Sequence, residues 1–281
     1  MLTWLPLSTA VAFQDCKRYA VEDVNRMSTR ELAETMMLPT IVSGALSAWK
    51  VPSNRESFLD AFGTHEILAA RTHFAAHRDT SQFGTYAERV QGQRAYTQKH
   101  VLVSEFVTHF ASEHIVLFSD EPGMSQRETA LLNAMHAVRE TPMFLSRRND
   151  TTFFSFGSNR QGVNTANHGM TWIALIAGRK LWHVRDGSLP KPREPVCSID
   201  PPERIPGTLA CTQNAGEIIV LPTAWWHATC NLGEFTVGIG GQDSCDLGCT
   251  EAVRKDPNAP FCHDTSRHVV CWKRPTVRDE L

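Results

Sequence analysis

The sequence predicts a mainly β fold, a sandwich or barrel, that follows an N-terminal part rich in helices. After residue 150, short runs of β-branched and aromatic residues follow one another with turns between them and no helical segment. Before residue 150, apolar residues recur at helical spacing behind capping residues. The chain has 281 residues, of which 42% are hydrophobic and 21% charged, enough for one large domain or two small ones.

Four helices are expected in the N-terminal part. They cover residues 28–37, 53–62, a segment that begins at 104, and 125–137. The first begins with a capping box, in which Ser28 is the N-cap and Glu31 the N3 residue. Ser53 caps the second, and Gly63 follows its last residue as a typical C-terminal cap. Between these two helices, the apolar run 39–45 predicts a short strand.

Six strands are expected in the second half of the chain. They cover residues 151–157, 171–177, 180–184, 217–221, 227–231 and 235–239. Gly178 marks a tight turn between the second and the third of them. The Pro-rich stretch 189–206 interrupts the series, and we expect a long loop there.

Charge and hydropathy exclude two classes of partner. The chain has 28 Lys and Arg residues against 30 Asp and Glu, a formal net charge of −2, so bulk electrostatics gives no reason to expect nucleic-acid binding. The longest apolar stretch, residues 2–13, is too short to span a bilayer. We therefore expect neither a nucleic-acid partner nor a membrane span.

Both ends of the chain carry address signals. An apolar run at 2–7 followed by Ala-Val-Ala at 10–12 predicts a signal peptide over residues 1–12, with a buried strand or helix as the alternative. The last four residues, 278–281, read Arg-Asp-Glu-Leu and match a K-D-E-L type retrieval signal with Arg in place of Lys. Asn149 begins an N-x-[ST] sequon and is a candidate glycosylation site. Together these features predict the lumen of the endoplasmic reticulum.

The cysteines agree with an oxidising compartment. There are eight, an even number, and seven of them follow residue 190, which favours disulfides over zinc ligation or free thiols. We expect a nested arrangement, with Cys249–Cys262 inside Cys245–Cys271, in a Cys-rich extension over residues 242–277. These bonds would staple a short helical hairpin at the C-terminus. Zinc and free thiols stay open as alternatives, although the spacing is not C-x2-C.

Three motifs carry a resemblance to a known family. They are Pro39-x-Ile41-Val42-x-Gly44-x4-Trp49, Gly178-Arg179-Lys180-x-Trp182, and Pro222-x-x-Trp225-Trp226-His227-Ala228-Thr229-x-Asn231. In these the chain resembles the Jumonji-C domain family, and above all its branch in the lumen of the endoplasmic reticulum. The resemblance implies a double-stranded β-helix, the jelly-roll barrel of the cupins, with N-terminal helices, in a domain over residues 13–241.

The resemblance also implies where metal ligands would lie. Jumonji-C enzymes hold Fe(II) with His-x-Asp/Glu and a distal His, and leave positions open for 2-oxoglutarate and oxygen. By register these positions are Ala166, His168 and His227 here. A methyl group replaces the first ligand and a histidine the carboxylate, so two neutral imidazoles remain. Asn164 or Asn167 could add only a weak amide ligand.

Each residue that survives from the family's site has a second interpretation. Lys180 stands where the family pairs a lysine with the 2-oxoglutarate carboxylate, but a surface lysine on an edge strand would look the same. His227 is either a metal ligand or a hydrogen-bonded core histidine. His168 is either a ligand or a partner for loop hydrogen bonds.

Two functions follow from this reading. The first is a non-catalytic binding or regulatory protein with a degenerate iron site, which presents its barrel mouth or its helices to a lumenal protein partner. The alternative is an Fe(II)/2-oxoglutarate-dependent hydroxylase that modifies a lumenal protein at a two-histidine site. Ala166 and the missing carboxylate favour the first, whereas Lys180 and the two histidines favour the second. We expect the first.

Overall fold

The structure is a computed structural model of the chain. It describes residues 15–71, 98–110, 114–119, 130–131, 133–135, 137, 143–145, 151–163, 165–192, 197, 207–242, 263–264 and 269–270. Several expected features lie outside these residues: the signal peptide 1–12, Asn149, the cysteines Cys245, Cys249, Cys262 and Cys271, and the retrieval signal 278–281. They stay predictions.

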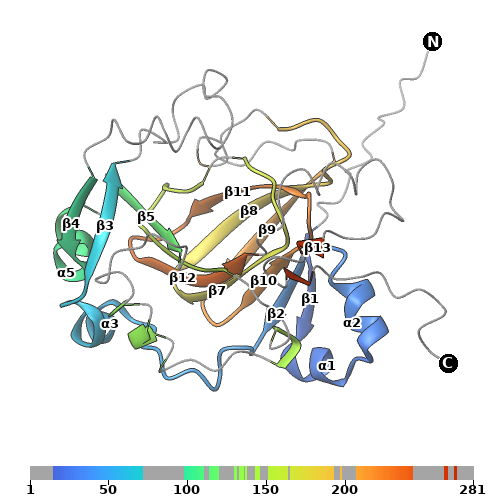
Figure 1. Cartoon of the computed structure of the whole chain (residues 1–281), viewed down its shortest axis with the longest axis horizontal. Helices are drawn as coiled ribbons and strands as arrows, with labels where there is room; N and C mark the ends of the chain where they lie inside the picture. Colours follow the sequence, from blue (N-terminus) through green and yellow to red (C-terminus); the bar gives the residue numbers. More distant parts are fainter. Residues whose placement is uncertain are drawn as a thin grey trace, which may run out of the picture.

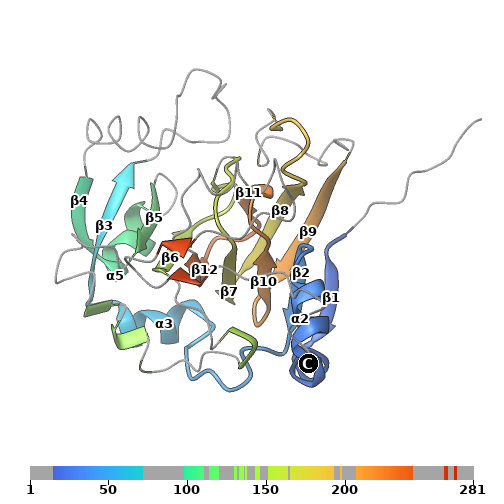
Figure 2. The ribbon, with the colours of Figure 1, turned by 45° about the vertical axis from the view of Figure 1, so that its right-hand side comes forward.

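A nine-stranded sheet runs through the molecule in the order β1-β2-β10-β7-β12-β6-β5-β3-β4 (Figure 1). Its strands are β1 (Lys17–Ala20), β2 (Thr40–Ser43), β3 (Glu66–Arg71), β4 (Gln98–Leu102), β5 (His114–Ser119), β6 (Thr151–Gly157), β7 (Thr171–Ala177), β10 (Ile218–Leu221) and β12 (Thr236–Gln242). The pair β1–β2 is parallel, and the other strand pairs of this sheet are antiparallel. In both views β1 and β3–β4 lie at opposite ends (Figures 1 and 2).

A second sheet has three strands, with β8 (Arg179–Arg185) between β11 (Trp226–Asn231) and β9 (Thr208–Asn214). Residues 161–163 and 165–168 run along the free side of β11, where Ala166 and His227 exchange both backbone hydrogen bonds at 3.0 and 2.9 Å. Gly162 allows this approach, because a Cβ at that position would lie 1.7 Å from the carbonyl oxygen of Thr229. The segment therefore serves as a fourth, irregular strand of this sheet.

The two sheets pack face to face over an apolar interior. Its buried residues come from both sheets: Ile41, Ile173, Ile219 and Leu221 from the large one, and Trp182, Val184 and Cys211 from the small one. Strands β10-β7-β12-β6 thus face β11-β8-β9 and the described residues that run beside β11. This is the arrangement of a double-stranded β-helix, and it confirms the expected fold class.

The other face of the large sheet is covered by the N-terminal helices α1 (Val21–Arg26), α2 (Thr29–Thr35), α3 (Arg55–Phe62) and α5 (Val103–Glu105). A π-helical turn, Phe106–Phe110, continues α5. Phe58 of α3 packs edge-on against Phe156 of β6, with ring centroids 5.4 Å apart. Phe106 lies 6.1 Å from the same ring, so aromatic side chains join the helices to the barrel.

The helix starts are partly as predicted. The capping box of Ser28 and Glu31 is present at α2. At α3 the N-cap is Asn54 and not Ser53, because the Asn54 side chain accepts a 2.9 Å hydrogen bond from the Ser57 amide. The prediction of a helical first half missed β3, β4 and β5, which extend the large sheet.

Two disulfides hold the barrel together. Cys16, just before β1, is bonded to Cys211 of β9, so this bond joins an edge of the large sheet to an edge of the small one. Cys197, within the predicted loop 189–206, is bonded to Cys230 of β11. The expectation of disulfides is confirmed for these four cysteines, which are all those that the structure describes. Disulfides fit a secreted or lumenal protein.

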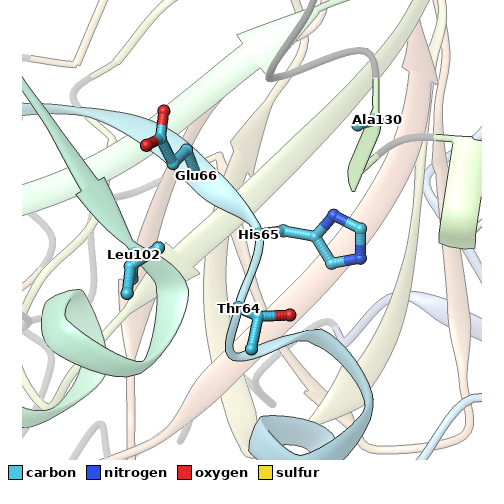
Figure 3. A pocket seen from close by; sticks show the side chains of 5 residues that line it. All are labelled: Thr64, His65, Glu66, Leu102 and Ala130. Atoms are coloured by element: carbon cyan, nitrogen blue, oxygen red, sulfur yellow. The ribbon is translucent and has the colours of Figure 1, made fainter.

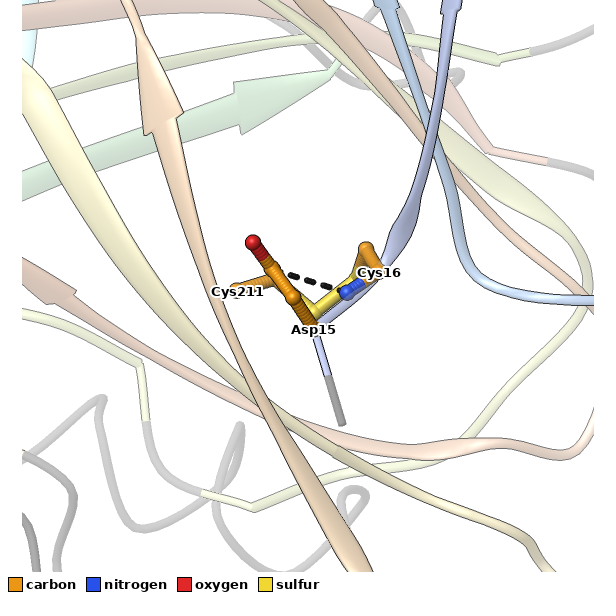
Figure 4. A group of neighbouring side chains, drawn as sticks. All are labelled: Asp15, Cys16 and Cys211. Carbon is orange, nitrogen blue, oxygen red and sulfur yellow. Dashed lines mark hydrogen bonds between the residues drawn. A yellow bond between two sulfur atoms is a disulfide. The ribbon is translucent and has the colours of Figure 1, made fainter. Parts of the chain in front are cut away.

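Close to the first disulfide, Asp15, Cys16 and Cys211 bring three potential ligand atoms within 4.8 Å of one another (Figure 4). Both sulfurs are already bonded to each other. The Asp15 carboxylate accepts a 2.7 Å hydrogen bond from the Cys16 amide. This group is therefore a disulfide beside a side-chain hydrogen bond at the start of β1, and not a metal site.

In the C-terminal extension the described residues form one small antiparallel pair, β13 (His263–Asp264) with β14 (Val269–Val270). None of these four residues is helical. Across the described parts of the chain, we find no helix with the length and apolar character needed to cross a membrane.

Candidate functional site

The interior face of the small sheet carries the predicted site residues. Cross-strand pairs place His227 opposite Val184, Thr229 opposite Trp182, and Asn231 opposite Lys180. Side chains at paired positions share one face of a sheet, and here all six are buried. The structure thus brings His227 and Lys180 onto one wall of the barrel, on either side of Trp182.

His168 and His227 meet in this interior. Their Nε2 atoms are 3.0 Å apart, and the rings stand nearly perpendicular, with centroids 4.5 Å from each other. A backbone hydrogen bond helps to fix the segment that carries His168. His168 accepts a 3.0 Å hydrogen bond at its carbonyl oxygen from the amide of Ala224, whose φ of 68° is a left-handed conformation that is rare for alanine.

Hydrogen bonds fix which nitrogen of each ring carries the proton. Nδ1 of His168 lies 2.9 Å from the carbonyl oxygen of Gly169, and Nδ1 of His227 lies 2.9 Å from that of Trp225. A carbonyl oxygen can only accept, so each Nδ1 carries a hydrogen and each Nε2 has a lone pair. Burial lowers the pKa of both rings, and the neighbouring His168 lowers that of His227 further, so both are neutral near pH 7.

Two lone pairs that face each other at 3.0 Å are suited to a shared cation. Imidazole nitrogens bound to one metal ion at about 2.1 Å, with a right angle between the bonds, lie about 3.0 Å apart. A carbonyl group that holds the other ring nitrogen is also the usual support of a metal-bound histidine. The pair therefore fits two neighbouring positions of a divalent cation.

The third position does not fit the family's iron site. The backbone pairing with His227 puts Ala166 on the same face as that histidine, where it offers only a methyl group. Among the described residues, no carboxylate or third histidine joins His168 and His227 in a group of three ligands. Asn167 follows Ala166 directly, and neighbouring residues of an extended segment point to opposite faces. Asn164 lies outside the described residues.

Lys180 is buried, with 2% of its surface exposed, and points across the barrel. Its Nζ donates a 3.3 Å hydrogen bond to the Ser155 hydroxyl of β6 and lies 5.9 Å from the ring centre of Trp182. No carboxylate pairs with it among the residues that the structure describes. Burial lowers the pKa of Lys180 to about 8, so near pH 7 it is an ammonium group without a counter-charge.

This environment suits a small anion. A buried ammonium group with one hydroxyl partner has two further N–H donors, and a carboxylate would satisfy both the donors and the charge. Trp182 lies between the two candidate contacts, because its ring centre is 6.4 Å from that of His227 and 5.9 Å from Nζ of Lys180. The alternative of a surface lysine on an edge strand is excluded by the burial of Lys180 and by the central place of β8.

Sequence reasoning missed Ser155 as a member of this site. It is a single hydroxyl residue within the aromatic run 153–156, and that lone polar position on a buried strand was a usable signal. Asn231 was noticed only as part of a motif. Its Oδ1 is buried without a hydrogen-bond partner, directly across from Lys180. The carbonyl groups that orient the histidines left no trace in the sequence.

A surface depression lies elsewhere, where α3 leads into β3 and near β4. It is lined by Thr64, His65, Glu66, Leu102 and Ala130 (Figure 3). Glu66 and Leu102 lie in β3 and β4 at one end of the large sheet, whereas β8 and β11 belong to the small sheet. Its lining residues include none of the histidine and lysine site.

The chain is thus a double-stranded β-helix that holds a pair of histidines and a lysine in its interior. No protein-family model matches the chain. The chain is similar to JmjC domain-containing protein 8 of Homo sapiens, with 24% identity over 208 residues that cover 69% of this chain and 72% of that protein. It is also 24% identical over 242 residues to the protein of the same name from Rattus norvegicus, covering 80% and 83%. These similarities support a relationship to the Jumonji-C family.

Proposed function

We propose that this protein is a Jumonji-C-like barrel that binds a small dicarboxylate of the 2-oxoglutarate type without oxidising it. In this account it acts as a non-catalytic binding or regulatory protein with a lumenal protein partner. The observation that carries the proposal is the methyl group of Ala166 beside a converging pair of imidazoles.

Anion binding is supported by Lys180. Its ammonium group is buried with one neutral hydrogen-bond partner, which is unfavourable unless a ligand supplies negative charge. The second carboxylate of the ligand would extend toward His168 and His227, on the other side of Trp182, where a cation shared by the two Nε2 lone pairs would neutralise it. A dicarboxylate is therefore a better match than a monocarboxylate.

The lack of oxidation is argued from the ligand set. When an iron ion is bound by the full triad, it supplies the redox chemistry by which this family activates oxygen. Among the residues that the structure describes, two neutral donors remain here and no carboxylate joins them to offset the charge of the ion. Because divalent iron also ranks low in the general affinity order of such ions, two imidazoles alone should hold it weakly.

The second candidate function is that of an active protein hydroxylase. The specific observation in its favour is the 3.0 Å approach of the two Nε2 atoms, together with the buried Lys180. Both features are what a working site would retain.

Formation of succinate from 2-oxoglutarate, in the presence of Fe(II) and ascorbate, separates the two candidates. We expect the purified wild-type protein to form no more succinate than a His227→Ala variant. Iron-dependent formation of succinate by the wild type, lost in His227→Ala and kept in a His65→Ala control, would establish the hydroxylase and overturn the proposal. His65 is suited to the control because it lies in the remote depression of Figure 3.

We further propose that the protein resides in the endoplasmic reticulum. The support is the Arg-Asp-Glu-Leu sequence at 278–281, together with two disulfides that need an oxidising compartment. Deletion of residues 278–281 should move the protein from cell lysate to culture medium. A truncated protein that stays inside the cell while folding normally would contradict retrieval through this signal.

A further inference from the structure

The outer face of the small sheet carries a second group of buried polar side chains. On this face of β8, His183 and Arg185 are two residues apart, and Arg185 is paired across the sheet with Thr208 of β9. Residues at such positions lie within about 5–7 Å of one another at their Cβ atoms. This face is separated from the histidine and lysine site by the sheet itself.

All three side chains have buried polar atoms without partners. Both ring nitrogens of His183, Nε of Arg185 and Oγ1 of Thr208 are buried and make no hydrogen bond. His183 is 6% exposed, whereas Arg185 and Thr208 are half-buried. Buried polar groups are nearly always satisfied in folded proteins, so four such atoms on three adjacent residues indicate a binding site.

The chemistry of these groups indicates the ligand. Arg185 carries a fixed positive charge and only donates, and Thr208 has a hydroxyl hydrogen free to donate. Burial lowers the pKa of His183, so the ring is neutral and has one N–H donor. Three donors and one positive charge are complementary to a ligand that has several acceptor oxygens and a negative charge.

His183 has small neighbours across the sheet, and a second cation lies close to the same face. His183 is flanked across the sheet by Ala228 on β11 and Ala210 on β9, the smallest side chains that a strand offers apart from glycine. Beyond Arg185, the ring of Trp226 lies under the ammonium group of Lys191, at 5.8 Å. A second cation thus stands at the margin of the same face.

We propose that Arg185, Thr208 and His183 form a site for a small oxyanion, such as inorganic phosphate, sulfate or a short carboxylate, on the outer face of the small sheet. Arg185 supplies the charge and Thr208 a second donor. His183 closes the inner end with one N–H. This site is independent of the dicarboxylate site at Lys180, because β8 directs the two sets of side chains to opposite faces.

The test is calorimetric titration of the full-length protein with phosphate, sulfate and acetate at matched ionic strength. We expect saturable binding by the wild type. Arg185→Gln and Thr208→Val should each weaken it at least about tenfold, since a hydrogen bond to a charged group is lost. The three anions show whether a divalent phosphate or sulfate or a carboxylate is preferred.

Arg179→Gln is the matched control, because Arg179 lies on the same strand and the same face but is exposed. It should bind like the wild type. Equal binding by the wild type and by both Arg185→Gln and Thr208→Val would overturn the site, as would the absence of saturable binding to any of the three anions. If Arg185→Gln does not fold, Thr208→Val and its comparison with the control decide the question.

Discussion

Replacement of Lys180 by methionine should stabilise the ligand-free protein and abolish its binding of 2-oxoglutarate. Burial lowers the pKa of Lys180 to about 8, against about 10.4 for a lysine in an unfolded chain. This difference corresponds to about 3 kcal/mol of unfavourable free energy for the charged form in the folded state. Methionine has a similar length and no charge, so Lys180→Met should raise the free energy of unfolding at pH 7 by about 3 kcal/mol.

The lowered pKa of Lys180 also makes the free energy of unfolding depend on pH. Between about pH 8 and pH 10.4 the unfolded chain keeps a proton on Lys180 that the folded protein has released, so stability rises with pH in this range. The destabilisation is fully present below pH 8. Across this pH range the free energy of unfolding, measured with denaturant, should therefore rise by about 3 kcal/mol more in the wild type than in Lys180→Met.

Lys50 provides the control for Lys180→Met. It is exposed, so Lys50→Met should leave stability, its pH dependence and the binding of 2-oxoglutarate nearly unchanged. A folded Lys180→Met protein that is no more stable than the wild type would show that burial of the Lys180 charge does not destabilise the protein. If it is still stabilised by 2-oxoglutarate, Lys180 does not contact this ligand.

The barrel strands could be predicted because their sequences agree with their surroundings. β7 and β10 are continuous apolar runs that are buried throughout, and Gly178 has the φ of 82° that a one-residue turn between β7 and β8 requires. β9 was missed because its sequence, Thr-Leu-Ala-Cys-Thr-Gln-Asn, is half polar and follows a Pro-rich stretch. β3 and β5 form by pairing with partners distant in sequence, which local patterns do not encode.

The site was predictable to the level of residues but not of contacts. Alignment with the family's motifs identified Lys180 and His227. Gly162 and Gly178, which lie on either side of Ala166 and His168, fixed the alignment of these two residues. The tautomers depend on how the rings turn toward the carbonyl groups of Gly169 and Trp225, and the environment of Lys180 depends on Ser155 from the other sheet. The disulfide partners also arise from tertiary contacts, since Cys16 and Cys211 are 195 residues apart.

The central claim is that Ala166 removes the third donor from an otherwise formed cation site. Ala166→His adds an imidazole beside His168 and His227, on the face that already holds their Nε2 atoms. A four-ligand zinc site is worth about 10–16 kcal/mol, so one further donor should contribute about 3 kcal/mol, or about 100-fold in affinity. Asn167→His is the matched control, because it adds the same group to the opposite face of the same segment.

Anaerobic titration with Fe(II), followed by calorimetry, measures this most directly. We expect weak binding by the wild type and by Asn167→His, and binding about 100-fold tighter by Ala166→His. The account predicts that His227→Ala removes the gain when it is combined with Ala166→His. Tight binding of Fe(II) by the wild type, lost in His227→Ala and not increased by Ala166→His, would contradict it.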